Sequence, residues 1–186
     1  LRYYLKDVKG YKYDEVNAVL TASDDDPLDA TERVHAISLV RPTPNFEPLA
    51  TSFKRIKNIL KQAGGVEQYA ARNIDTCLLE QGAEATLHSS FKQLRPRVAK
   101  DKQEGNYALA LTAIASLRPA VDKLFDDVLV MAEDEKIRDN RLTFLALLLK
   151  EFSTIADFAE IVSTSWHLEA TQTSLQATQN ITMEKV

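Results

Sequence analysis

The sequence is poor in the residues that build turn-rich or cross-linked folds. Only 5 of its 186 residues are Gly and 6 are Pro, which disfavours an all-β fold with many tight turns and favours helices. It has one cysteine, Cys77, so no internal disulfide can form, and we expect a reducing compartment. Because a free cysteine usually behaves as a small apolar residue, we predict that Cys77 lies in the core.

Residue patterns for catalysis are also missing from the sequence. It contains no GxGxxG or GxxxxGK(S/T) loop to hold phosphates, and none of its three histidines has a second His or Cys at metal-ligand spacing: His35, His88 and His167. The acidic pair Asp126 and Asp127 is better explained as helix capping than as acid–base catalysis. We therefore predict a chain that is itself non-catalytic, with no metal site and no cofactor of its own.

Charge and hydropathy argue against a membrane protein. The net charge is −4, so any basic surface for a nucleic acid must be local. The long apolar run over 142–161 is predicted to be a buried core helix, not a membrane span, because it is interrupted by Lys150, Glu151, Asp157 and Glu160. The chain begins at Leu1 without a secretory signal, and we expect a piece of a longer cytoplasmic protein with no membrane partner.

Helical periodicity covers most of the chain. Asp14 is predicted to cap a helix over 15–22, and Asp26 with Pro27 to open a helix that runs to Arg41. The next segment is predicted to be an extended loop because it holds Pro42, Pro44 and Pro48.

The clearest amphipathic helix follows over 49–63. Its apolar residues recur at helical spacing, and we predict that Phe53 and Ile56 are buried against the last helix; the full apolar set is Leu49, Phe53, Ile56 and Leu60. Gly64 and Gly65 are expected to end it. Further helices are predicted over 84–102 with a break near Pro96, over 104–119, and from Asp134 to about Val162.

Two basic clusters are the functional candidates. The outer side of the 49–63 helix carries Asn58 and four cations with no acid between residues 54 and 61: Lys54, Arg55, Lys57 and Lys61. Together with the nearby Phe46, this stripe is typical of a surface for RNA phosphates and unstacked bases. A merely solvated helix face remains an equally simple interpretation, although such faces usually mix both signs. The second, less specific cluster comprises Lys92, Arg95, Arg97, Lys100 and Lys102.

Mixed charges also precede the last helix, in the segment EDEKIRDNR over 133–141. Its acids suit a helix start, where the dipole favours negative charge. Arg138 and Asn140 are candidates either to contact RNA or to hold neighbouring helices. Arg141 falls on the apolar seam, so we predict a structural role for it, paired with an acid such as Asp126 or Asp127.

Residues 122–158 resemble the anticodon-binding domain named DALR, found in arginyl- and cysteinyl-type synthetases and in bacterial glycyl-tRNA synthetase beta subunits. The beta-subunit pattern is the nearest: an F-D-x-V-x-V-M run at 125–131, a D-E-x-(L/I)-R-x-N-R-L segment at 134–142, and A-D at 156–157. The name-giving tetrapeptide corresponds to EKIR, where Lys136 and Ile137 replace Ala and Leu. Further matching segments extend the likeness to about 1–162, among them GYKYDEVNAVLTA, PLDATERVHAI and FKRIKNILKQA.

The resemblance implies an all-α helical bundle of the DALR type that binds the anticodon region of glycine tRNA beside a glycyl-tRNA synthetase alpha subunit. ATP and Mg²⁺ would be used by that alpha subunit. We divide the chain into a preceding-domain remnant and linker (1–45), a DALR-type bundle (46–162), and a polar tail that is an extra helix or disordered (163–186). The predicted tRNA-binding residues are Lys54, Arg55, Lys57, Asn58, Lys61, Arg95, Arg97, Lys100, Arg138 and Asn140.

Two alternatives stay open. One is the equivalent domain of an arginyl-tRNA synthetase, against which the segments FKRIKNIL and DEVNAVL argue. The other is a helical scaffold that only joins subunits and leaves its basic stripe in solvent.

Overall fold

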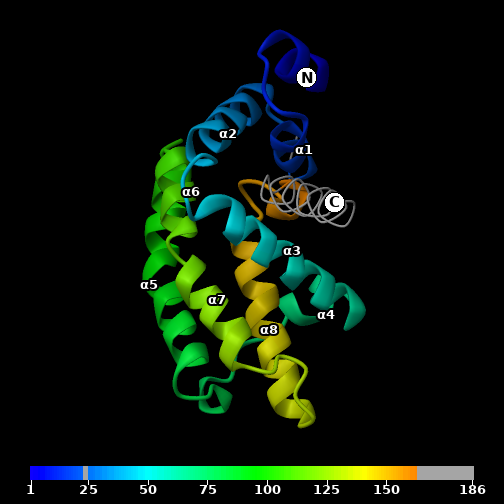
Figure 1. Ribbon diagram of the computed structural model, residues 1–186, viewed down its shortest axis with the longest axis vertical. Helices are drawn as coiled ribbons and strands as arrows, with labels where there is room; N and C mark the ends of the chain where they lie inside the picture. Colours follow the sequence, from blue (N-terminus) through cyan, green and yellow to red (C-terminus); the bar gives the residue numbers. More distant parts are fainter. Residues whose placement is uncertain (23–24, 163–186) are drawn as a thin grey trace, which may run out of the picture.

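The computed structural model describes residues 1–22 and 25–162, and every regular element in these ranges is helical. The predicted all-α class is thus confirmed (Figure 1). The predicted polar tail, 163–186, lies outside the described residues. In chain order the elements are η1 (Tyr4–Val8, a π-helical turn), α1 (Tyr13–Ala22), α2 (Pro27–Val40), α3 (Phe46–Gln62), α4 (Val66–Ala70), η2 (Thr76–Leu78, 3-10), α5 (Ala83–Gln103), α6 (Tyr107–Ala115), α7 (Arg118–Asp127), α8 (Glu135–Phe152) and η3 (Phe158–Glu160, 3-10).

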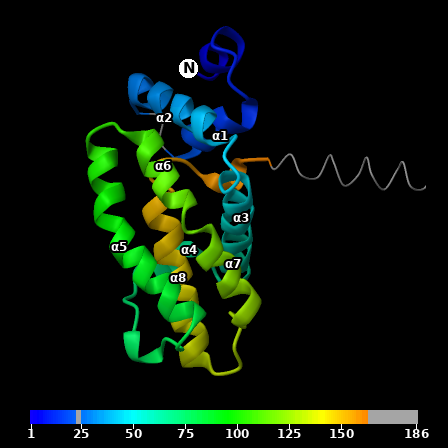
Figure 2. The ribbon, with the colours of Figure 1, turned by 60° about the vertical axis from the view of Figure 1, so that its left-hand side comes forward.

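Helix α8 runs through the middle of the bundle. From Asn140 to Phe152 nearly every side chain is buried, so neighbours must cover the helix on almost all sides. Helices α5 and α3 lie on opposite sides of α8 and α7 (Figure 2), and α4 packs directly on α8. Helices α1 and α2 lie at the end of the bundle near the N-terminus.

The start of α8 agrees with the sequence, but its end does not. Asp134 is the N-cap and accepts hydrogen bonds from the N–H groups of Lys136 (2.8 Å) and Ile137 (3.1 Å). The helix ends at Phe152, well before the predicted Val162. The chain turns away because the Asp157 N–H donates to the carbonyl of Ala18 in α1 at 2.8 Å, which directs η3 toward α1 and α3.

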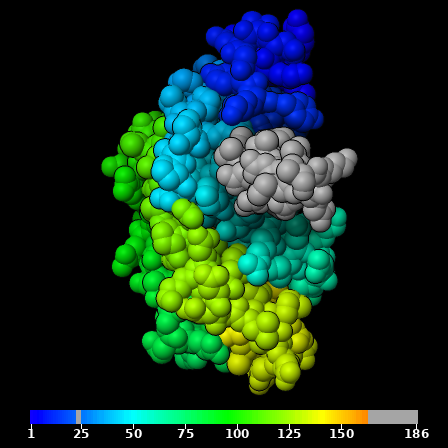
Figure 3. Space-filling model, viewed as in Figure 1, coloured from blue at the N-terminus to red at the C-terminus, as the bar shows by residue number. Residues whose placement is uncertain are grey.

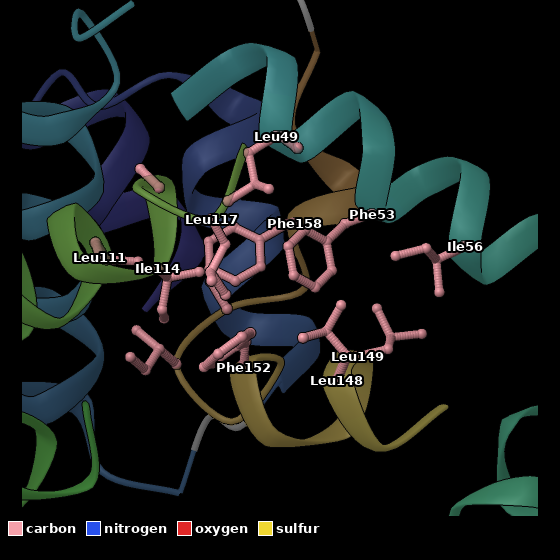
Figure 4. Close-up of a cluster of buried hydrophobic side chains, with 14 of the residues drawn as sticks. Leu49, Phe53, Ile56, Leu111, Ile114, Leu117, Leu148, Leu149, Phe152 and Phe158 are labelled. Atoms are coloured by element: carbon pink, nitrogen blue, oxygen red, sulfur yellow. The ribbon is translucent and has the colours of Figure 1, made fainter. Parts of the chain in front are cut away.

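The core of the contact between α3 and α8 is aromatic (Figure 4). Phe53 and Ile56 are fully buried, as predicted. The Phe53 ring centroid lies 6.2 Å from that of Phe152 at the end of α8 and 5.4 Å from that of Phe158 in η3. Phe46 is also buried, 5.9 Å from Phe158. These rings hold the segment after α8 in place beneath α3.

The structure confirms the predicted cap at Asp26 but differs from the predictions for the proline-rich loop and for Pro96. Asp26 caps α2 as predicted, accepting hydrogen bonds from the N–H groups of Leu28 (2.8 Å) and Asp29 (3.3 Å). The proline-rich loop is shorter than predicted, because α3 already begins at Phe46 and tolerates Pro48 in its first turn. The predicted break at Pro96 is wrong: α5 continues through it. Pro96 is exposed, so water can reach the carbonyl that its missing N–H leaves unpaired.

Arg41 joins the N-terminal helices to the rest of the bundle. Its buried guanidinium forms ion pairs with Asp14 (2.8 Å), Glu15 (3.1 Å) and Glu47 (3.0 Å), and it donates to the carbonyl of Val162 at 2.7 Å. The sequence analysis predicted that Asp14 caps the helix, and this is wrong. Asp14 lies inside α1 and pairs with Arg41. Burial alone would raise the pKa of Asp14, but hydrogen bonds from Arg41 and from the Val162 N–H outweigh it and lower that pKa.

Replacing Phe53 by Ala should lower the free energy of unfolding by about 3–5 kcal/mol, because it removes a fully buried ring and leaves a cavity. Chemical denaturation followed by circular dichroism measures this loss. Leu109→Ala is the control: Leu109 is 52% exposed, so its change should stay within about 0.5 kcal/mol. Equal effects of the two variants would contradict the packing of α3 on α8.

Replacing Asp14 by Asn should destabilise the protein in a pH-dependent way. An acid whose pKa is lowered by folding stabilises the protein above its unfolded value, here 3.8, and this contribution is lost as the pH falls through the lowered folded-state pKa. The stability gap between the wild type and Asp14→Asn, measured by urea titration, should be full at neutral pH and shrink below pH 3.8. A gap that is independent of pH would argue against the ion pair with Arg41.

Candidate nucleic-acid interface

The outward face of α3 carries unpaired polar side chains. Lys54, Asn58 and Lys61 are exposed and have no hydrogen-bond or ion-pair partner within residues 1–22 and 25–162. The helix contains one acid, Glu47, which lies in its first turn, at the opposite end from Lys61, and pairs with Arg41. The opposite face of α3 is buried, so the outward face is fixed in direction. Figure 3 shows this side of the molecule, with α3 and α4 in teal beside α7 in yellow-green.

Lys57 differs from its neighbours on α3. Its ammonium lies 2.5 Å from the carboxylate of Asp157, whose side chain is 12% exposed. Asp157 in turn caps η3 by accepting from the Ala159 N–H at 3.1 Å. The charge of Lys57 is therefore neutralised, and the residue joins α3 to η3.

Arg55 stacks on an aromatic ring that the sequence analysis did not select. Its guanidinium carbon lies 4.0 Å from the ring centroid of Phe125 in α7. The predicted aromatic neighbour, Phe46, is instead buried in the core at 2% exposure, because α3 begins there and turns the ring inward. The guanidinium of Arg55 is thus supported on one face and exposed to solvent.

Three of the five basic residues of α5 form ion pairs with acids whose side chains range from 12% to 50% exposed. Arg95 donates to Glu151 at 2.9 Å, and the ion pairs Arg97–Asp101 (3.6 Å) and Lys100–Glu104 (3.9 Å) are longer. Such surface pairs contribute little and exchange readily, so these cations stay available to a competing anion. The structure thus leaves two basic surfaces, on α3 and on α5, and these two helices lie on different sides of α8 (Figure 2).

The polar residues at the head of α8 hold the fold together. Asn140 is 6% exposed; its amide accepts from the Asp75 N–H (2.8 Å) and donates to the Asp75 carbonyl (3.0 Å). Of its two candidate roles, contacting RNA or holding neighbouring helices, the buried and occupied amide fits the second. Arg138 is half-buried and donates to the carbonyl of Ala132 at 3.1 Å, which fixes the turn before the helix.

Arg141 is structural, as predicted, but with other partners. It is 6% exposed and pairs with Glu84 (2.9 Å) and Glu80 (3.0 Å), not with Asp126 or Asp127. The acids expected to bind it are exposed at the end of α7, whereas the start of α5 passes beside α8. Burial opposes the charge of Arg141, but the two glutamates outweigh it and raise its pKa.

A hollow of about 320 Å³ between α5, α8 and the segment after α4 escaped the sequence analysis. It is lined by Ile74, Thr76, His88, Phe91, Lys92, Arg95, Leu147 and Glu151. Cys77 follows Thr76 in η2 and is exposed, so its prediction as a core residue is wrong. A short 3-10 turn that lies across the surface directs its side chain outward. In the sequence, the apolar spacing of α5 and α8 was the only signal related to this hollow.

In the described ranges, the histidines form no metal site and the helices include no candidate membrane span. No cluster of three metal-ligating side chains occurs there. His35 lies near the Tyr11 hydroxyl (3.2 Å) and His88 packs edge-on against Phe144, while His167 lies outside the described residues. Among the helices of the described chain, none is long and apolar enough to span a bilayer.

Comparison with known proteins supports one family. A family model described as the DALR anticodon binding domain matches residues 49–165. The beta subunit of glycine–tRNA ligase from Acidobacterium capsulatum is 44% identical over 167 residues, which cover 88% of this chain and 24% of that protein. The proteins of the same name from Geotalea uraniireducens and Desulforapulum autotrophicum are 43% and 40% identical, over 81% and 82% of this chain and 21% and 22% of their own lengths.

The chain thus spans about a quarter of the length of the first of these relatives. The match includes the helices α3 to α8 that surround the aromatic core and carry both basic surfaces. It also includes the three motifs over 125–157 that first indicated the resemblance, which is confirmed. The chain belongs to the family of DALR anticodon binding domains.

Proposed function

We propose that this chain is the module of a glycine–tRNA ligase beta subunit that binds the anticodon region of glycine tRNA. The family match and the names of the relatives support this function over that of an arginyl-tRNA synthetase domain. The chain itself contributes binding and positioning in this proposal. Activation of glycine with ATP and Mg²⁺ takes place in a partner alpha subunit, and the assembly works in the cytoplasm.

The observation that carries the proposal is the outward face of α3. Lys54 and Lys61 keep free positive charges on a chain whose net charge is −4. RNA phosphates attract such charges, and phosphate contacts orient a nucleic acid on its protein. Arg55, held over Phe125, and the free amide of Asn58 add groups that suit an unstacked base.

A double change, Lys54→Ala with Lys61→Ala, should weaken the binding of glycine tRNA and flatten its salt dependence. Each lost phosphate contact lowers the log–log slope by about 0.7–0.9, so two contacts give a change of about 1.4–1.8. Filter binding over a range of salt concentrations measures both quantities. Because both side chains are exposed, the melting curve should not move.

Lys57→Ala is the matched control, since it removes the same charge from the same helix. Asp157 already neutralises Lys57, so the slope should change less, while the stability falls because the ion pair between α3 and Asp157 is lost. An affinity for glycine tRNA that the double change leaves unaltered in the intact assembly would reject the α3 surface and move the interface to Arg95, Arg97 and Lys100.

The function itself is tested by comparing glycine tRNA, arginine tRNA and an unrelated tRNA. Preference for glycine tRNA supports the proposal; preference for arginine tRNA would favour the arginyl-type domain, and no binding at all the subunit scaffold. ATP–pyrophosphate exchange with glycine on the isolated chain should stay at background. Robust exchange would contradict the proposal that glycine is activated in the alpha subunit.

A further inference from the structure

The hollow between α5 and α8 has the size of a small binding pocket. Its volume of about 320 Å³ lies at the small end of the roughly 300–1,000 Å³ that ligand sites span. Ile74, Phe91 and Leu147 give it an apolar lining. Such a space suits one planar group better than a large ligand.

The aromatic side chains of the hollow are held by the core. The Phe91 ring lies 6.2 Å from Phe144 and 5.6 Å from Phe152, and His88 packs edge-on against Phe144 at 5.6 Å. These contacts fix the rings before any ligand binds, so the side chains lose little conformational entropy on binding. Aromatic and histidine rings are the usual partners of an unstacked base.

Positive charges lie beside this apolar space. Lys92 is exposed, and the described part of the chain offers it no hydrogen-bond or ion-pair partner. Arg95, one turn further along α5, is 60% exposed and donates its Nε–H to Glu151 Oε2. Both cations belong to residues that line the hollow, so each is a candidate to bind the phosphate of a nucleotide whose base occupies it.

Glu151 adds an acceptor with an unused site. One of its oxygens is occupied by Arg95, whereas no group of the described chain donates to the other, Oε1. An ionised carboxylate only accepts hydrogen bonds, so it selects a ligand edge that carries donors. An exocyclic amino group of a nucleobase is such a donor, and cytosine is the base with which Glu pairs in this way.

We propose that the hollow holds one unstacked nucleobase that carries an exocyclic amino group, with Lys92 and Arg95 at its phosphate. The inference rests on the proposed function only in that the ligand is RNA. Cytosine is accepted because its amino group donates to Glu151. Uracil binds less tightly because it presents a carbonyl oxygen at the same position, where two acceptors would face each other.

The only cysteine of the chain is a built-in reporter of this site. Cys77 is exposed and follows Thr76, which lines the hollow. Short oligocytidylate should slow the reaction of Cys77 with a chromogenic disulfide, and oligouridylate should do so only at higher concentration. We expect the half-protecting concentration of oligocytidylate to be about tenfold lower.

Glu151→Gln should abolish this preference and leave the fold intact. An amide both donates and accepts, so Gln can pair with either base. The matched control is Glu104→Gln, since Glu104 is likewise paired with an α5 cation, Lys100, but lies outside the hollow. It should keep the tenfold difference. His88→Ala should weaken protection by both oligonucleotides equally, because stacking does not distinguish them.

The results separate this inference from the proposed function. A wild-type chain that binds glycine tRNA but protects Cys77 equally with both oligonucleotides, or not at all, overturns the pocket and leaves the function standing. A preference that survives Glu151→Gln overturns the role of Glu151 and with it the proposal. Failure to bind any of these RNAs overturns both. Because no residue of α3 lines the hollow, the salt slope of the Lys54 and Lys61 variants is an independent readout.

Discussion

The near-complete burial of α8 is the constraint on which the rest of the structure depends. A helix that is buried on almost every side must be surrounded, and α3, α4 and the side chains of α5 supply the surrounding surfaces. Two of the polar side chains carried into this environment have partners there: Asn140 binds the backbone of Asp75, and Arg141 binds Glu84. Each of these contacts also fixes a loop or helix start beside α8. The orientation of both basic surfaces follows from this arrangement.

Local signals in the sequence predicted the helices well and their ends unevenly. Asp26 and Asp134 are recognisable caps because an N-cap needs only residues two or three positions away. Asp14 looked like a cap for the same reason, but a tertiary partner, Arg41, lies 27 positions on and claims its carboxylate. The end of α8 was missed for a similar reason. The Asp157 N–H donates to the carbonyl of Ala18 in α1, and this contact directs the chain away from α8. Spacing alone carries no information about such partners.

The candidate interface shows the same division. The single-sign stripe on α3 was visible in the sequence, and its exposure follows from the buried face opposite. That Lys57 is neutralised by Asp157, 100 positions away, was not visible. Nor was the hollow at Glu151, because it is formed where α5, α8 and the segment after α4 meet. Sites assembled from several elements leave no pattern within any one of them.

The backbone of Val162 has a consequence for how motion passes through the molecule. Its N–H donates to the Asp14 carboxylate at 2.9 Å, and its carbonyl accepts from Arg41 at 2.7 Å. A pull on the chain at this point is therefore transmitted to α1 through Asp14, and through Arg41 to the end of α2 and to Glu47 at the start of α3. Force applied to the chain at Val162 thus reaches three helices at once.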